Sequence, residues 1–277
     1  MAPRNGLPPY SALMAVYEGD QAPWVEEAVA SLAGQSWPPR EIVIVEDGPL
    51  PAAIREVLSA WESRLPGVLR FLPGRERQGL AEAMKRGIEA CRCEWIARMD
   101  ADDLCAPRRC EKELRSALAH GADLVGCDCA EFTESPDKPV SLRVFPETHE
   151  ELVRFSRRKT PFCHPAVMMK KSAVLKAGNY RAVRFLEDYD LFVRMFSSGA
   201  KGYTVKETLH YVRVGKDFYS RRGGWAYVKT LMAYNVSLLK EGWTRPSDFL
   251  VRSCGNILVG LAPCGLRAWM YRRLLRK

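Results

Sequence analysis

The stretch Trp95-Ile96-Ala97-Arg98-Met99-Asp100-Ala101-Asp102-Asp103 is a short, mostly apolar run that ends in three aspartates. A short apolar run bounded by a turn is typical of a strand that is buried on both faces. Aspartate favours turns because its side chain hydrogen-bonds nearby backbone groups. We therefore predict a strand over 95–99 that leads directly into an acidic turn.

Alternating strands and helices surround this stretch. Strands are predicted over 10–16, 42–45, 68–72 and 123–127, and helices over 24–32, 51–64, 79–91 and 107–119. The alternation indicates a doubly wound, mostly parallel α/β sheet. Ligands of such sheets bind beyond the carboxyl ends of the strands, near the point where the strand order reverses.

Acidic residues gather at those predicted strand ends, in Tyr17-Glu18-Gly19-Asp20, Glu46-Asp47-Gly48 and Asp100-Ala101-Asp102-Asp103. Crowded carboxylates repel one another unless a cation or hydrogen-bond donors offset their charge. Mg²⁺ and Mn²⁺ prefer carboxylate and phosphate oxygens, so the last group is a candidate metal and diphosphate site. The alternative is a solvated turn in which Asp103 caps the helix near Pro107.

A second acidic group, Glu187-Asp188, stands at the start of a predicted helix over 187–197. Carboxylates at a helix start interact favourably with the helix dipole, so a capping role is one interpretation. The other is a general base that removes a proton from an acceptor hydroxyl. Nothing in the local sequence separates the two.

The chain has 277 residues and a net charge of +9, which favours an anionic partner. A nucleic acid, an acidic membrane surface and a phosphorylated substrate all meet that condition. Because the sequence contains no recognised nucleic-acid-binding motif, we expect no nucleic-acid partner. The nine cysteines are odd in number, and no signal peptide precedes the first strand, so free thiols in a reducing cytoplasm are expected. No window offers the ~20 apolar residues of a spanning helix, so a soluble or peripheral protein is expected.

Five segments in a fixed order resemble family 2 glycosyltransferases of the GT-A fold. They are Glu46-Asp47-Gly48, Gln78–Ala83 with Arg86-Gly87-Ile88, Asp100–Asp103, Phe162–Met168, and Glu187-Asp188. The resemblance covers roughly residues 10–215 and is closest to the bacterial branch that builds exopolysaccharide, capsule and lipopolysaccharide. It implies a GT-A catalytic domain over 1–222, with a nucleotide-binding half over about 10–130 and an acceptor half over about 131–222. Residues 223–277 would then form a helical, basic, amphipathic C-terminal segment.

The resemblance also implies roles for single residues in binding a nucleotide-sugar donor, for which a UDP-sugar is expected. The segment that lines the base and ribose matches Ala15, Tyr17 and Glu18. Asp47 matches the aspartate that hydrogen-bonds the uracil edge, and Gly79 would allow the backbone to approach the nucleotide closely. Asp100, with Ala101, would contact the ribose or sugar.

The implied catalytic centre combines a metal with a base. Asp102 would ligate Mn²⁺ or Mg²⁺, and His164 would contact the metal or the diphosphate, unless it is a satisfied core histidine. Asp188 matches the catalytic base, and Glu187 would position the base or the acceptor. Direct displacement by the acceptor hydroxyl would invert the anomeric carbon. Four cations are candidates to close over the diphosphate, with a solvated loop as the alternative: Arg213, Lys216, Arg221 and Arg222.

The C-terminal segment combines apolar residues from Ile257 to Leu275 with Arg267, Arg272, Arg273, Arg276 and Lys277. A basic amphipathic helix can lie in an anionic membrane surface, and the alternative is a helix that packs its apolar face on the catalytic domain. The resemblance implies a glycan or polyprenyl-diphosphate-linked acceptor, which places the protein in the cytoplasm at the inner face of the membrane. The absence of a Gln-x-x-Arg-Trp motif favours addition of one sugar over processive synthesis.

Two other functions remain open at this stage. A sugar-phosphate nucleotidyltransferase needs an N-terminal Gly-rich, basic triphosphate loop, but residues 10–25 contain only Gly19 and no Lys or Arg. A non-catalytic, membrane-associated glycan-binding protein predicts disrupted carboxylates, yet Asp47, Asp100, Asp102 and Asp188 are intact. The sequence leaves the donor sugar, the acceptor, the linkage and the oligomeric state undetermined.

Overall fold

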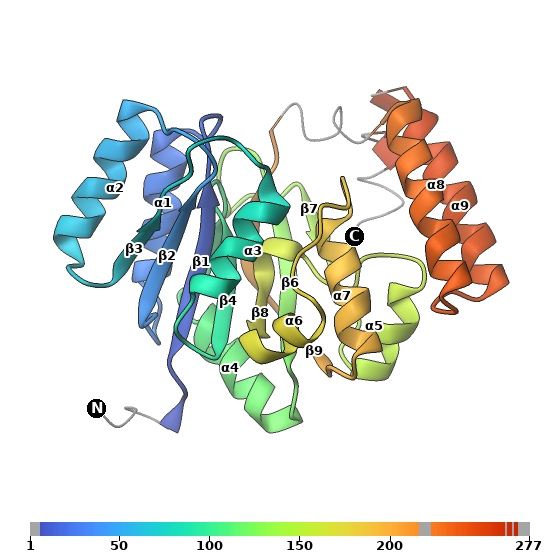
Figure 1. The fold of residues 1–277 in the computed structure, drawn as a ribbon, viewed down its shortest axis with the longest axis horizontal. Helices are drawn as coiled ribbons and strands as arrows, with labels where there is room; N and C mark the ends of the chain where they lie inside the picture. The colour runs from blue at the N-terminus through green and yellow to red at the C-terminus, as the bar shows by residue number, and fades with distance from the viewer. Residues whose placement is uncertain (1–5, 216–222, 264, 268, 271–277) are drawn as a thin grey trace.

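The computed structural model describes residues 6–215, 223–263, 265–267 and 269–270. In these residues the chain builds one nine-stranded sheet with helices on both faces (Figure 1). The strands are β1 (Tyr10–Val16), β2 (Glu41–Glu46), β3 (Leu69–Leu72), β4 (Trp95–Asp100), β5 (Leu104–Cys105), β6 (Leu124–Phe132), β7 (Ser141–Arg143), β8 (Val167–Lys170) and β9 (Gly202–Arg213). The helices are α1 (Ala22–Ala33), α2 (Ala52–Arg64), α3 (Leu80–Ala90), α4 (Arg109–His120), α5 (His149–Ser156), α6 (Lys171–Lys176), α7 (Glu187–Ser197), α8 (Trp225–Lys240), α9 (Pro246–Leu261) and the 3₁₀ turn η2 (His164–Ala166).

The strand order is β3-β2-β1-β4-β8-β6-β9-β5, with β7 paired to β6. The first four strands are mutually parallel, and α1, α2 and α3 connect or flank them as the alternating sequence pattern predicts. Because β1 is followed by β2 on one side and flanked by β4 on the other, the order reverses at β1. The predicted doubly wound, mostly parallel α/β sheet is therefore confirmed.

The second half of the sheet departs from simple alternation. The strand predicted over 123–127 is β6, and it runs in the same direction as β4 but is not adjacent to it, because β8 lies between them and is antiparallel to both. Arg213, a candidate cation for closure over the diphosphate with a solvated loop as the alternative, is the last residue of the long strand β9. Strand pairing between segments far apart in sequence leaves no local signal, since each strand shows only its own apolar pattern.

Alternating side chains on the strands build two cores. Ala12, Met14, Ile42 and Ile44 point to one face, where α1, α2 and α4 cover them. The intervening residues, such as Leu13 and Val43, point to the opposite face under α3 and α7. Both cores are fully buried because the strands are covered on each side, as the uninterrupted β-branched run of β2 predicts.

The C-terminal helices α8 and α9 pack side by side next to α7 (Figure 1). Leu231 and Leu238 of α8 contact Leu186, Tyr189 and Val193. The helix α9 ends at Leu261, and the backbone at Ala262 is extended. The following Pro263 lacks the N–H that would continue the helix, and its ring restricts Ala262. None of the helices in the described part of the chain is long and apolar enough to cross a membrane.

The close packing of α3 on the sheet depends on Gly87. A Cβ at this position would lie 2.3 Å from Leu13 Cδ1 and 3.0 Å from Val45 Cγ2, and both of those side chains are fully buried. We expect Gly87→Ala to lower the free energy of unfolding by about 1–3 kcal/mol, because a full core has no room for the methyl group. Urea denaturation would measure the change.

Gly255, in the middle of α9, is the matched control because a Cβ there would meet nothing within 4 Å. Gly255→Ala should raise the free energy of unfolding by roughly 0.5–1 kcal/mol through helix propensity alone. Equal effects of the two substitutions would contradict the packing described for α3.

Candidate active site

The carboxyl ends of β1, β2 and β4 meet at one edge of the sheet. Ala15 of β1 is in register with Val45 of β2 on one side and with Asp100 of β4 on the other. The Asp47 N–H, just after β2, donates to the Val16 carbonyl at 2.9 Å. Three segments predicted to contact the donor are thus adjacent, at the position where ligands of open α/β sheets bind.

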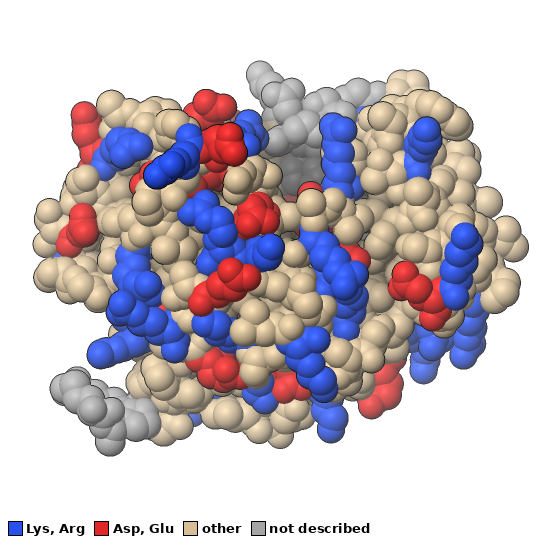
Figure 2. Space-filling view, viewed as in Figure 1, with Lys and Arg blue, Asp and Glu red and all other residues tan. Residues whose placement is uncertain are grey.

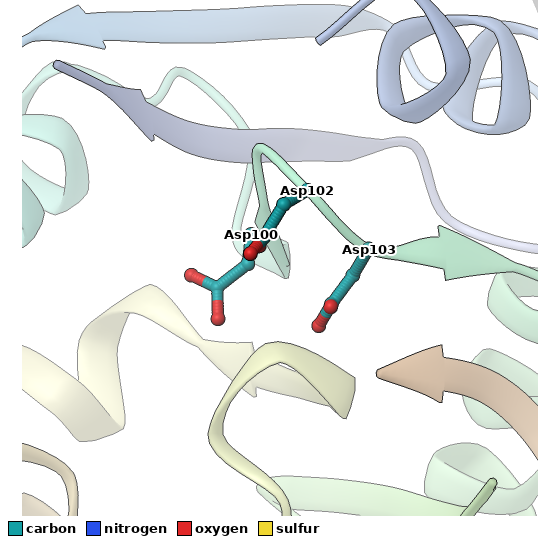
Figure 3. Close-up of side chains that lie close together, drawn as sticks. All are labelled: Asp100, Asp102 and Asp103. Carbon is teal, nitrogen blue, oxygen red and sulfur yellow. The ribbon is translucent and has the colours of Figure 1, made fainter. Parts of the chain in front are cut away.

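The acidic turn after β4 carries three carboxylates that extend to the same side (Figure 3). One oxygen from each of Asp100, Asp102 and Asp103 lies within 4.8 Å of the others. Burial and the negative charge of Asp100 together raise the pKa of Asp102 to about 6. A group of ionised oxygens at this spacing suits a divalent cation, which would offset their repulsion.

A buried arginine lies beside this cluster. Arg98 of β4 is 1% exposed, and its Nη2 forms an ion pair with Asp100. Its Nε and Nη1 have no hydrogen-bond partner among the described residues. The charge of Arg98 also lowers the pKa of Asp188, although burial acts more strongly in the opposite direction. Arg98 therefore contributes positive charge to both acidic groups of the site. An arginine inside an otherwise apolar strand was the sequence signal for this role.

Asp103 faces inward and does not cap a helix. Its carboxylate accepts a hydrogen bond from the Arg213 N–H at 2.9 Å and pairs with His210 Nε2 at 2.9 Å. The residue at the N-cap of α4 is Arg108, with no side-chain cap. The interpretation of Asp103 as a helix cap is therefore wrong, because β9 brings donors that the local sequence does not contain. Because both carboxylate oxygens of Asp103 are engaged, Asp100 and Asp102 are the better candidates for metal ligands.

The Asp103–His210 pair belongs to a wider buried network. His210 Nδ1 lies 3.3 Å from Arg109 Nη1, and Arg109 Nε donates to Glu113 at 3.2 Å. All of these side chains are almost completely buried. Burial and the charge of Arg109 hold the pKa of His210 well below its usual range, so the ring is neutral. The network fixes the acidic turn to α4 and β9.

Arg213 holds the same turn from the other side. Its guanidinium lies 4.6 Å from the Phe132 ring centroid and 5.0 Å from that of Trp24. Its Nε donates to the Asp102 carbonyl at 2.9 Å, and Nη2 pairs with Glu27. With a side chain only 9% exposed, Arg213 supports the turn in this structure and does not extend over it. The other three cations considered for closure, Lys216, Arg221 and Arg222, lie outside the described residues.

Asp47 joins the end of β2 to the start of α3. Its Oδ1 accepts hydrogen bonds from the backbone N–H of Gln78 at 2.7 Å and of Gly79 at 3.0 Å. Gly79 has a φ of +93°, which favours glycine, and a Cβ at Gly74 would lie 2.2 Å from the Glu46 carbonyl oxygen. The 74–79 loop therefore lies directly against the end of β2. Asp47 and Gly79, predicted as donor contacts, are joined to each other.

Tyr17 and Glu18 form a small cluster with two residues not assigned a role from the sequence. The Arg77 guanidinium lies 4.4 Å from the Tyr17 ring centroid and 3.8 Å from Glu18. Asp20 accepts a hydrogen bond from the Tyr17 N–H at 2.9 Å. Burial, together with the charges of Asp102 and Asp100, raises the pKa of Asp20 to about 7. Arg77 and Asp20 are thus further residues of the site. The sequence pointed to Asp20, because it belongs to the acidic turn at the end of β1, but it contained no local feature that pointed to Arg77.

Glu187 and Asp188 both lie in the first turn of α7. Burial raises the pKa of Asp188, while hydrogen bonding from Tyr189 and the charges of Arg143 and Arg98 lower it. Burial and the neighbouring Asp188 raise the pKa of Glu187. A carboxylate with a raised pKa is a better proton acceptor than an exposed one, which suits a general base.

His164 lies near this region but outside the acidic cluster. Its Nε2 is 2.8 Å from the Tyr180 hydroxyl. Burial and the charge of Arg98 hold its pKa well below the usual range, so the ring is neutral. Among the described residues, the group close enough to share a metal comprises Asp100, Asp102 and Asp103 without His164. The structure therefore joins His164 to Tyr180 and leaves its metal role as a prediction.

The fold and the acidic site are those of a GT-A glycosyltransferase, and comparison with known proteins supports this class. A mannosyltransferase from Pyrobaculum calidifontis, solved with GDP-Man and Mn²⁺, matches 97% of this chain and 70% of its own with a TM-score of 0.66 at 18% identity. At that identity the likeness shows the GT-A fold. The model of the family described as Glycosyl transferase family 2 matches residues 11–178.

Two curated relatives match almost end to end. The amylovoran biosynthesis glycosyltransferase AmsE of Erwinia amylovora is 31% identical over 95% of this chain and 98% of its own. The UDP-Gal:alpha-D-GlcNAc-diphosphoundecaprenol beta-1,3-galactosyltransferase of Escherichia coli is 26% identical over 99% of this chain and 98% of its own. This chain belongs to glycosyl transferase family 2, as the five ordered segments indicated.

Arg213 offers a test of how the turn is held. We expect Arg213→Met to weaken Mn²⁺ binding by roughly 10-fold or more, because groups that orient metal ligands typically contribute that much to affinity. Isothermal titration calorimetry on the purified protein would measure the dissociation constant.

The matched control is Arg55→Met, which removes an exposed arginine whose ion pair with Glu46 spans 3.8 Å. It should leave Mn²⁺ affinity unchanged. If Arg213→Met binds Mn²⁺ as tightly as the unsubstituted protein, Arg213 does not position the acidic turn.

Proposed function

We propose that this protein transfers one sugar from a nucleotide-diphosphate sugar, a UDP-sugar, to a hydroxyl of a glycan or polyprenyl-diphosphate-linked acceptor, with inversion. The observation that carries the proposal is the three-carboxylate cluster at the end of β4, beside the β1 and β2 ends where a nucleotide binds in this fold. The two relatives add support, since one acts in amylovoran biosynthesis and the other uses UDP-Gal and a diphosphoundecaprenol acceptor. The proposed setting is cell-surface polysaccharide biosynthesis.

The residues of the acidic turn fit a divalent cation, Mn²⁺ or Mg²⁺. All three of their side chains are carboxylates, which these cations prefer. Burial and the charge of Asp100 raise the pKa of Asp102, and a bound cation would offset the repulsion between the two carboxylates. Asp102 and Asp100 would hold the ion, because Asp103 is engaged by His210 and Arg213. When bound, such an ion stabilises the negative charge that develops on the leaving nucleoside diphosphate.

Asp188 is the proposed general base. It accepts the proton of the acceptor hydroxyl as that oxygen attacks the anomeric carbon from the face opposite the diphosphate, so the configuration inverts. Glu187, in the same helical turn, would position the acceptor or the base. On the donor side, Ala15, Tyr17, Glu18, Asp47 and Gly79 would bind the nucleotide, and Asp100 with Ala101 would contact the ribose or sugar.

The alternatives considered from the sequence lose support. Membership of family 2 favours neither a nucleotidyltransferase nor a non-catalytic glycan-binding protein. Two of the intact residues, Asp100 and Asp102, are also grouped with Asp103, with one oxygen from each within 4.8 Å of the others. We further propose that the protein works in the cytoplasm, attached peripherally to the inner face of the membrane, where a polyprenyl-linked acceptor would be found.

The first test is a donor screen. The purified protein is offered a panel of UDP-, GDP- and dTDP-sugars with and without Mn²⁺, and hydrolysis or transfer is measured by nucleotide release. Asp102→Ala should lower activity with the best donor by about 100-fold or more, since metal stabilisation of the leaving group is worth several kcal/mol. Asp137→Ala, an exposed aspartate of a surface loop, is the matched control. Full activity of Asp102→Ala, or activity independent of metal, would refute the proposed metal site.

The base is tested by pH. Asp188 must be deprotonated to act, so activity should fall as the pH drops through a pKa above the ordinary carboxyl range of ~3.9. Arg143→Gln removes a charge that lowers this pKa, and should move the acid limb of the kcat profile to higher pH. Arg143→Lys retains the charge and should restore the limb. A limb that does not move in Arg143→Gln would contradict the assignment of Asp188.

A further inference from the structure

The helix α9 is amphipathic, but its polar side faces the protein and its apolar side faces outward. Its polar residues Asp248, Arg252 and Ser253 are buried against the protein. Its large apolar residues face outward, with Leu250 61% and Leu258 67% exposed. A surface helix normally turns its apolar stripe to the core. The orientation of α9 therefore contradicts the alternative in which the C-terminal segment packs its apolar face on the catalytic domain.

Specific contacts hold α9 in this orientation. Asp248 accepts a hydrogen bond from Arg158, beyond α5, at 2.6 Å. The Arg252 guanidinium lies 4.1 Å from the Tyr189 ring centroid, and Ser253 bonds Asn235 of α8 at 3.2 Å. Rotating the helix to bury its leucines would break all three contacts and turn Asp248 and Arg252 away from Arg158 and Tyr189. The outward apolar stripe is thus built into the packing.

The outer surface of α9 continues into neighbouring segments. Ile257, Leu258, Leu261, Ala262, Leu266 and Met270 line an apolar hollow of about 370 Å³. Trp269 and, at the start of α8, Trp225 are also largely exposed. We call these residues, together with Leu250 and Val251, the C-terminal apolar surface. A contiguous apolar surface of this kind marks an interaction site, because isolated exposed leucines would not align.

Charge identifies what covers this surface. Residues 223–277 contain nine Lys and Arg but only two acidic residues, Glu241 and Asp248, and Asp248 is paired with Arg158. Lys229 and Lys240 of α8 and Arg245 at the start of α9 are exposed. In Figure 2 the part formed by α8 and α9 is accordingly mostly tan and blue. A two-fold dimer through this surface would bring like charges together. An anionic lipid surface offers both an apolar interior and negative headgroups.

We propose that the C-terminal apolar surface lies on an anionic lipid bilayer, with Leu250 and Leu258 inserted at the headgroup boundary. This deepens the proposed function, on which it rests for the lipid-linked nature of the acceptor. The helix α7, which begins with Glu187 and Asp188, packs on α8, and Tyr234 of α8 bonds Asp190 at 3.3 Å. Docking through α8 and α9 therefore places the lipid one helix away from the base.

Vesicle co-sedimentation of the full chain tests the surface. We expect binding to vesicles of phosphatidylglycerol and phosphatidylethanolamine, weakened by salt, and at least tenfold weaker binding to pure phosphatidylcholine. The double variant Leu250→Ser, Leu258→Ser should bind the anionic vesicles at least tenfold more weakly. The matched control is Leu118→Ser, Leu175→Ser, which changes two exposed leucines of α4 and α6 and should bind normally.

Three outcomes would contradict the proposal that the C-terminal apolar surface binds an anionic bilayer. They are no binding to anionic vesicles, equal binding by the α9 double variant, and a dimer in solution that the double variant converts to a monomer. Donor hydrolysis, measured in the absence of lipid, reports separately on the proposed function. If vesicle binding fails while hydrolysis persists, the proposed lipid binding is refuted and the transferase function stands. If hydrolysis fails while vesicle binding persists, the transferase function is refuted and the lipid binding stands.

Discussion

The mutual repulsion of Asp100, Asp102 and Asp103 is the constraint around which the site is arranged. Three carboxylates within 4.8 Å of one another, partly removed from water, destabilise the turn that carries them unless positive charge and donors surround it. Arg98 supplies the charge from within β4, beside Asp100. His210 and the Arg213 N–H engage Asp103 from β9. The remaining repulsion falls on Asp100 and Asp102, and it is what a cation would relieve.

These contacts explain why a long strand from the second half of the chain runs to the acidic turn. β9 lies parallel to β6 and continues as far as Arg213, whose side chain packs between Trp24 and Phe132. The Arg109–Glu113 pair fills the space behind His210. A buried polar network stabilises a fold only when its members are satisfied, and then it holds one geometry firmly. The result is a preorganised set of ligands held by elements on three sides.

The proposed base is held by a different part of the molecule. Asp188 lies in the first turn of α7, one face of which packs on the sheet and the other on α8. Arg98 acts electrostatically on Asp188 as well as pairing with Asp100, so the proposed base and the acidic cluster share one buried charge. The C-terminal helices thus pack against α7 while turning an apolar surface outward. The proposed base and the proposed lipid-binding surface are therefore joined through α7 and α8.

The ends of the strands β2 and β4 could be predicted from the sequence. A β-branched or apolar run followed by acidic residues is a local signal, because adjacent residues determine both the strand and the turn. Ile42–Asp47 and Trp95–Asp103 are the two examples. The start of α7 at Glu187 was readable for the same reason. Periodicity also indicated α2, α3 and α4 close to their observed bounds.

Long-range pairing was not readable. The insertion of β8 between β4 and β6 depends on pairs far apart in sequence, such as Trp95 with Lys170. The contacts of Asp103 with His210 and of Arg213 with Asp102 join residues 107 and 111 positions apart. The composition of α9 revealed its amphipathic character but not which side faces the protein, because Arg158 and Tyr189 decide that. By itself, the sequence determined which chemical groups stand at the strand ends. Only the tertiary structure decided which of those groups are engaged and which stay free, because their partners are brought together by folding and not by order along the chain.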